Sequence, residues 1–256
     1  MTSKIKILAL CLGLACIYSA CKKTASTTAD PALTPSDVAS QVAVTIDQSL
    51  FGSLGVDLSG GLSSASTFEY RTNGKVLQSL TNPDCSLVVD TTLSFSGTAN
   101  GGSATIGGTY KFSFACVNNV VSGFTTSDNL TIKITSSSLD LNYKVAENLK
   151  LASVNPSDAN ANLSLNGSLT SNAAYTINTG NKGSGTEVFN YTLTSAIFSP
   201  TLADVVSGSA SFNTSGTGPK GVWSYQGTIT FLGNHVATVV INSKTYTVNL
   251  LTGVVS

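Results

Sequence analysis

Apolar and polar residues alternate along most of this 256-residue chain once it has passed Gly60 and Gly61. Successive side chains of a β-strand point to opposite faces of the sheet, so an alternating segment is typical of a strand with one buried face. The clearest segments are 130–134, 163–169, 189–197, 206–212, 223–231, 236–241 and 246–250. Gly, Asn, Ser and Pro separate them, which indicates turns.

An antiparallel sheet that buries one face and exposes the other produces this alternation. We therefore expect a mainly β fold, with a single antiparallel β-domain over 35–256 and one amino-terminal helix. Its strands could form a sandwich or a curled sheet, and the period of two alone does not separate these from a barrel. No linker and no repeat of fixed period divides this part of the chain.

The helix is expected over residues 35–51. Thr34 can cap it and Pro35 suits its first turn. Apolar residues then recur at every fourth position, at Val38, Val42, Ile46 and Leu50. Residues 42–46 also alternate and are rich in β-branched side chains, so a strand is the competing interpretation.

One hairpin can be derived position by position. Asn100-Gly101 is a favoured two-residue turn, and it lies midway between Cys85 and Cys116. Pairing outward from it places residues whose numbers sum to 201 opposite each other, which aligns the two cysteines. We therefore predict a disulfide between them. The alternatives are a bulge at the glycines 101–102 or 107–108, which would shift the register, and two buried free thiols.

The first twenty residues have the layout of an export signal. Lys4 and Lys6 give a positive start, an apolar run covers 5–18, and Ser19-Ala20 precede Cys21. The run is shorter than the roughly 18 apolar residues of a membrane-spanning helix.

This segment resembles the signals of the bacterial lipoprotein class, in which the new terminal cysteine receives a diacylglycerol. The resemblance implies a signal peptide over 1–20 and lipidation of Cys21, with Ala15-Cys16 as an alternative cleavage site. Cys21-Lys22-Lys23, followed by a Ser/Thr tract, further resembles outer-membrane lipoproteins of the Bacteroidota. Residues 21–34 have no apolar periodicity and are expected to form a flexible tether.

Composition restricts the chemistry that the chain can perform. Charged residues make up 10% of it, against roughly 25% in typical soluble domains, and we expect no nucleic-acid partner. Its one histidine, His235, lies in a Gly-Asn-His segment that is expected to be an exposed hairpin turn. The sequence has no CxxC and no HExxH, so we expect no metal site, no cofactor and no catalytic residue.

Carboxylates are too sparse to indicate an acid–base pair. The glutamates are Glu69, Glu147 and Glu187, while Asp57, Asp84, Asp128 and Asp158 have the contexts of turn formers. The segment 158–162 spaces oxygen ligands like the start of a calcium loop, but it then lacks the glycine and the bidentate acid of that loop, so an Asx-turn is the favoured interpretation.

Trp223, Tyr225 and Tyr246 are candidates for a ligand platform on which a sugar could stack. They alternate with apolar partners, which favours packing in the core instead.

These observations predict a lipid-anchored cell-envelope protein, at the outer membrane or cell surface, with a non-enzymatic binding or structural role. Its expected partners are the membrane, through the anchor, and a glycan or an envelope protein. One alternative is a lipid or lipopolysaccharide carrier, in which the helix is a lid or filler over an apolar trough. The other is an envelope hydrolase that uses the sparse carboxylates.

Overall fold

A computed structural model of the chain describes residues 33–51, 68–72, 75–80, 85–99, 101–158, 160–180 and 182–256. The predicted signal peptide, Cys21, nearly all of the tether and Asn100 of the hairpin turn lie outside these residues. The described elements are α2 (Pro35–Phe51), β1 (Phe68–Thr72), β2 (Lys75–Leu80), β3 (Val88–Ala99), β4 (Gly102–Val117), β5 (Val120–Thr135), β6 (Leu139–Ser153), β7 (Leu163–Ile177), β8 (Gly183–Ser199), β9 (Asp204–Gly218), β10 (Gly221–Gly233), β11 (Val236–Ile241) and β12 (Lys244–Asn249).

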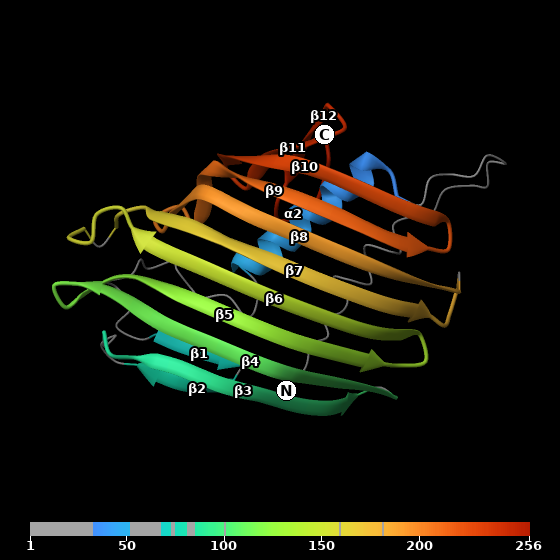
Figure 1. Cartoon of the computed structure of the whole chain (residues 1–256), viewed down its shortest axis with the longest axis horizontal. Helices are drawn as coiled ribbons and strands as arrows, with labels where there is room; N and C mark the ends of the chain where they lie inside the picture. Colours follow the sequence, from blue (N-terminus) through green and yellow to red (C-terminus); the bar gives the residue numbers. More distant parts are fainter. Residues whose placement is uncertain are drawn as a thin grey trace.

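Strands β3 to β12 form one ten-stranded antiparallel sheet in which each strand pairs with the next along the chain (Figure 1). Strands β3 and β12 are its two edges, so the sheet is not closed. Strands β1 and β2 form a separate two-stranded sheet. The expectation of a mainly β, antiparallel fold with one amino-terminal helix is confirmed for the described residues.

Helix α2 has the predicted bounds and the predicted cap. The Thr34 hydroxyl accepts a hydrogen bond from the backbone N–H of Asp37 at 3.2 Å, and the Asp37 carboxylate accepts the Thr34 N–H at 3.0 Å. This reciprocal capping satisfies backbone groups that the first turn of a helix leaves without partners. The competing strand interpretation of residues 42–46 is wrong, because these residues lie inside the helix.

The strands are longer than the alternating segments that indicated them. β8, for example, has 17 residues, and β6 and β7 have 15 each. Along β6, the odd-numbered side chains from Leu139 to Leu151 lie on the face that α2 packs against, which we call the covered face. The even-numbered ones from Asp140 to Lys150 lie on the opposite, outer face, where most are exposed.

The hydrophobic core lies between α2 and the covered face. Figure 1 shows the helix on the far side of the sheet in that view. The helix contributes six side chains that are each at most 7% exposed: Val38, Ala39, Val42, Ala43, Ile46 and Leu50. They belong to one cluster with residues of all ten strands of the large sheet, among them Leu130, Tyr191, Phe212, Ile229 and Val239.

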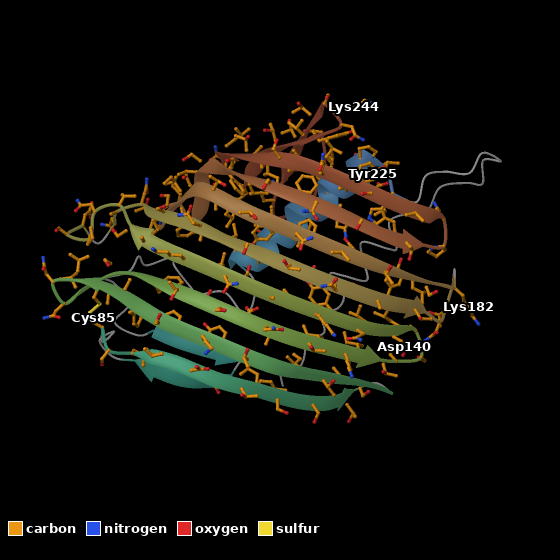
Figure 2. All side chains as sticks on the ribbon, viewed as in Figure 1. Cys85, Asp140, Lys182, Tyr225 and Lys244 are labelled. Atoms are coloured by element: carbon orange, nitrogen blue, oxygen red, sulfur yellow. A yellow bond between two sulfur atoms is a disulfide. The ribbon has the colours of Figure 1, made fainter. Side chains whose placement is uncertain are left out.

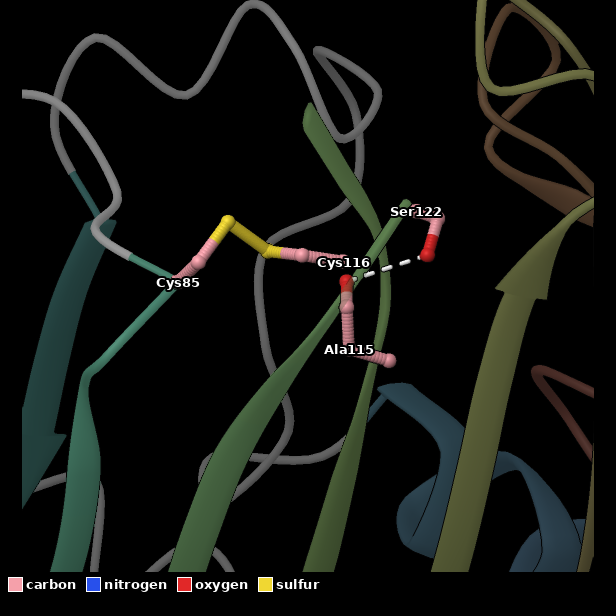
Figure 3. Close-up of a disulfide and its surroundings, with 4 residues drawn as sticks. All are labelled: Cys85, Ala115, Cys116 and Ser122. Carbon is pink, nitrogen blue, oxygen red and sulfur yellow. Dashed lines mark hydrogen bonds between the residues drawn. A yellow bond between two sulfur atoms is a disulfide. The ribbon is translucent and has the colours of Figure 1, made fainter. Parts of the chain in front are cut away.

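The β3–β4 hairpin has the predicted register throughout, with Phe95 opposite Ile106 and no shift at the glycines. Cys85 and Cys116 form a disulfide, with their Cα atoms 5.8 Å apart (Figure 3). A register shift lies beside the disulfide, between Ala115 and Cys116, where β4 pairs with β5. There the Ser122 hydroxyl donates to the Ala115 carbonyl at 3.1 Å.

Candidate functional site

A polar cluster is buried between α2 and the sheet. Asp128 of β5 and Glu147 of β6 are direct cross-strand neighbours on the covered face. The Tyr191 hydroxyl of β8 donates to Glu147 Oε1 at 3.1 Å, and the hydroxyl of Ser49 in α2 bonds to both Glu147 and Tyr191. We call Ser49, Asp128, Glu147 and Tyr191 the acidic cluster.

The environment of this cluster favours neutral carboxyl groups. The pKa of Glu147 is raised to about 7, chiefly by burial and also by the nearby Asp128 charge, against the opposing effect of hydrogen bonds from Ser49 and Tyr191. Burial likewise raises the pKa of Asp128 to about 6. Desolvation penalises the charged form of each carboxyl, so the pair takes up protons near neutral pH.

The prediction that Asp128 is a turn former is wrong, because it lies in the middle of a 16-residue strand. Polar residues on both sides, Ser127 and Asn129, imitate a turn in the sequence. The parity of the position gave the correct signal: Asp128 falls on the same alternate positions as Phe124 and Leu130. Glu147 shares the parity of Val145 and Leu149 in the same way, so each carboxylate was readable as facing the core.

The carboxylate of Glu187 binds the helix nearer its amino-terminal end. Gln41 of α2 donates to Glu187 Oε1, and the Thr214 hydroxyl of β9 donates to the same oxygen at 3.4 Å. Glu187 is 7% exposed. The helix is therefore held on the sheet by two polar contacts, Gln41–Glu187 and Ser49–Glu147, in addition to its apolar face.

His235 lies in the predicted turn, between β10 and β11, but it is not fully exposed. Its backbone N–H donates to Asp204 Oδ2 at 3.0 Å, and its Nδ1 lies 3.3 Å from Asp204 Oδ1. Asp204 is only 2% exposed. The Asp204 carboxylate thus accepts a hydrogen bond from the backbone of the turn, which explains why it is buried beside the imidazole. Among the described residues, no three His, Cys, Asp or Glu side chains are grouped as metal ligands.

The candidate aromatic platform is not open to solvent. Trp223 is 6% exposed, and its ring lies where a Cβ on Gly216 would come within 2.3 Å of it. Tyr225 and Tyr246 pack against the core, and the Tyr225 hydroxyl donates to the Leu33 carbonyl at 2.8 Å. Their alternation places all three rings on the covered face, where Trp223 is buried and Tyr225 and Tyr246 are partly buried.

The 155–162 loop has the hydrogen bonds of Asx-turns. Asp158 Oδ1 accepts the N–H of Asn160 at 2.9 Å, and Asn155 Oδ1 accepts that of Ser157 at 3.3 Å. The side chains expected to initiate turns here do so.

The outer face of the sheet is broad, polar and shallowly hollowed. One hollow of about 490 Å³ lies over Gly107, lined by Thr105, Thr109, Asn129, Thr131 and Lys133. A second of about 600 Å³ shares Lys133 and extends over β6 to β9, and a third of about 500 Å³ lies over β8 to β11. In the third hollow, the side-chain amide of Asn190 donates a hydrogen bond to the side-chain oxygen of Asn213, at 2.8 Å.

Lysines gather on the same face. Lys133, Lys144 and Lys150 extend from β5 and β6 and are exposed, and Lys111 of β4 forms an ion pair with Asp90 at 2.7 Å. Three described carboxylates, those of Asp128, Glu147 and Glu187, lie instead on the covered face. The buried carboxylates of these strands therefore face α2, whereas the outer face carries the lysines together with Asp90 and Asp140.

None of the described residues forms a helix long and apolar enough to cross a bilayer. Comparisons with protein-family models, with curated proteins and with solved structures find no match to this chain.

Proposed function

We propose that the protein is a lipid-anchored, non-enzymatic binding module of the bacterial cell envelope, attached through Cys21, and that its outer face binds an anionic glycan. The observation that carries the binding proposal is the hydroxyl- and amide-lined hollow at Lys133, next to Lys144. Ser, Thr and Asn side chains can hydrogen-bond sugar hydroxyls, and lysine ammonium groups attract carboxylate or phosphate substituents.

The covered face offers a ligand much less. Helix α2 occupies part of it, and the apolar and polar side chains of the helix that face the sheet both have partners there. The outer face has no such partner among the described residues, and it presents polar side chains from adjacent strands at the regular spacing of a sheet. A polymer with repeating charges suits such a surface.

Affinity electrophoresis tests this proposal, with polygalacturonate as the anionic probe and dextran as the neutral one. We expect polygalacturonate alone to retard the parent protein, and salt to weaken the retardation. Lys133→Ala with Lys144→Ala should abolish it. The matched control is Lys182→Ala with Lys220→Ala, which removes the same charge from turns. Equal retardation of the two double variants would show that net charge, and not this face, binds the polymer.

The anchor is tested separately by the intact mass of the mature protein. We expect a chain that begins at Cys21 and carries diacylglycerol, and a Cys21→Ser variant that lacks the lipid. A mature chain that begins elsewhere, with no added lipid, would refute the anchor and leave the glycan proposal standing.

A lipid carrier is the second candidate, because a 17-residue helix that buries an apolar stripe against a sheet is placed as a lid would be. Native mass spectrometry of the purified protein tests it. Acyl chains bound without covalent attachment would favour the carrier over the glycan-binding module.

A further inference from the structure

Exposed apolar side chains gather at one end of the sheet. Ten large apolar residues are exposed among the described residues. Six of them lie where β3 begins, in or beside the β4–β5, β6–β7 and β8–β9 turns, or near the end of β10: Val88, Val117, Val120, Val154, Leu202 and Leu232. Alternate turns of an antiparallel meander share one end, so these residues lie together at what we call the apolar end. Figure 1 shows its turns at the left.

The opposite end has a different character. Its turns, or the strand ends beside them, carry Asp140, Lys182 and Lys220, and Figure 2 shows Asp140 and Lys182 far from Cys85, which lies at the apolar end. One large apolar side chain, Val222, is exposed there. The molecule is therefore polarised along its strands.

Charge is scarce at the apolar end. In the described parts of its turns, Asp158 is the exposed charged residue, while His235 is paired with the buried Asp204. Val154 and Leu202 are 58% and 65% exposed, and exposed amides and hydroxyls such as those of Asn118, Asn119 and Thr201 lie beside the aliphatic side chains. Single exposed aliphatic residues are ordinary on protein surfaces, but the concentration of six of them at one end needs a cause.

The position of the tether allows this end to reach a membrane. Leu33, the first described residue, is bonded to the Tyr225 hydroxyl. Gly233, at the apolar end of the same strand, is eight residues further along β10, or roughly 27 Å. The twelve residues from Lys22 to Leu33 could span roughly 40 Å when extended. An acyl chain on Cys21 would therefore leave the apolar end within reach of the bilayer.

We infer that the apolar end rests on the phospholipid bilayer and inserts its aliphatic turn residues at the boundary between headgroups and acyl chains. This inference rests on the proposed anchor. A bilayer is the favoured partner because the side chains stand on separate hairpins, roughly 10 Å from one to the next. A fluid surface can surround separate tips, whereas a folded protein would need a matching pocket for each. In this orientation the strands rise from the membrane and the outer face stays open to solvent.

Tryptophan scanning in the lipidated full chain tests the inference. Leu202→Trp and Val154→Trp place a reporter at the apolar end, and Val222→Trp places one at the opposite end as the matched control. Each variant is reconstituted in phosphatidylcholine–phosphatidylethanolamine vesicles with and without brominated acyl chains. The parent protein supplies the background of Trp223, which is buried.

We expect bromolipid to quench at least half of the added emission from residues 154 and 202, with a shift to shorter wavelength, and to leave residue 222 unquenched. Quenching at residue 222 alone, or at none of the three, would overturn the inference. If a partner protein covers the apolar end in place of the bilayer, residues 154 and 202 will also stay unquenched, and the inference is overturned.

Failure of the anchor can be told apart from failure of this inference. If the mature protein has no lipid, the same variants are mixed with preformed vesicles instead of being reconstituted in them, and the bound protein is separated by flotation. Quenching at residues 154 and 202 would then support membrane contact without an anchor. A lipidated protein with no quenching there would retain the anchor and refute the contact.

Discussion

Replacing Glu147 with glutamine should stabilise the protein above pH 7 and change little near pH 4. Burial raises the pKa of this carboxyl from 4.5 to about 7 in the folded state. The neutral form is therefore favoured by folding, so its stabilising contribution is complete below about pH 4.5 and is lost as the pH rises through about 7. At about 1.4 kcal/mol per pKa unit, the loss builds up between about pH 4.5 and 7 and levels off at roughly 3 kcal/mol above pH 7.

Glutamine keeps the neutral shape and can still accept hydrogen bonds from Ser49 and Tyr191, but it cannot ionise. Urea unfolding of parent and variant at one-unit steps from pH 4 to 9 measures the difference in the free energy of unfolding. The variant should gain up to about 3 kcal/mol over the parent as the pH rises. Asp128 titrates with Glu147, so the midpoint belongs to the pair.

The matched control is Asp140→Asn. Asp140 lies on the same strand but on the outer face, where its carboxylate accepts a hydrogen bond from Asn178 at 3.0 Å. This variant should not reproduce the gain at high pH. A constant offset between Glu147→Gln and the parent across the whole range would refute the argument, because it would show that folding does not discriminate between the two charge states.

Other regions of the fold give further expectations. Replacing Cys85 and Cys116 with serine opens a 31-residue loop and should lower the free energy of unfolding by about 3.7 kcal/mol in the loop-entropy model; a urea midpoint that reduction of the parent leaves unmoved would contradict this. Gly227→Ala should lower the melting temperature, since its Cβ would meet the Val240 carbonyl oxygen at 2.2 Å and the Phe212 ring at 2.7 Å. A soluble, folded Gly227→Ala protein with an unchanged melting temperature would show that the strands can separate freely there. Excess calcium should leave the melting temperature of the parent unchanged, because Asp158 is already occupied as a turn acceptor; a calcium-dependent rise would restore the calcium-loop interpretation.

Much of the fold was predictable because its signals are local. The helix bounds followed from Thr34, Pro35 and a four-residue apolar repeat, and the β3–β4 register followed from one turn and two cysteines. A two-residue turn determines which residues face each other along the whole hairpin. Strand lengths were underestimated because small and polar residues such as Gly107 and Gly108 interrupt the alternation without ending the strand.

The candidate site was less predictable. Parity placed Trp223 and Tyr225 on the core side, and it could have placed Asp128 there as well. Parity does not reveal that Ser49 meets Glu147, which is 98 residues away along the chain. It also does not show that the lysines and hollows of the outer face lie on neighbouring strands.

The sequence by itself determined the strand periodicity, the one hairpin register, the helix and the pairing of two cysteines, because each depends on contacts between residues close along the chain or on a single turn. Only the tertiary structure decided that ten strands pair in sequence order in one open sheet, that α2 lies on one of its faces, and that carboxylates are buried there while lysines stay outside. Those features depend on how residues far apart in the sequence pack together, and burial, which is a property of that packing, is what raises the pKa of Glu147.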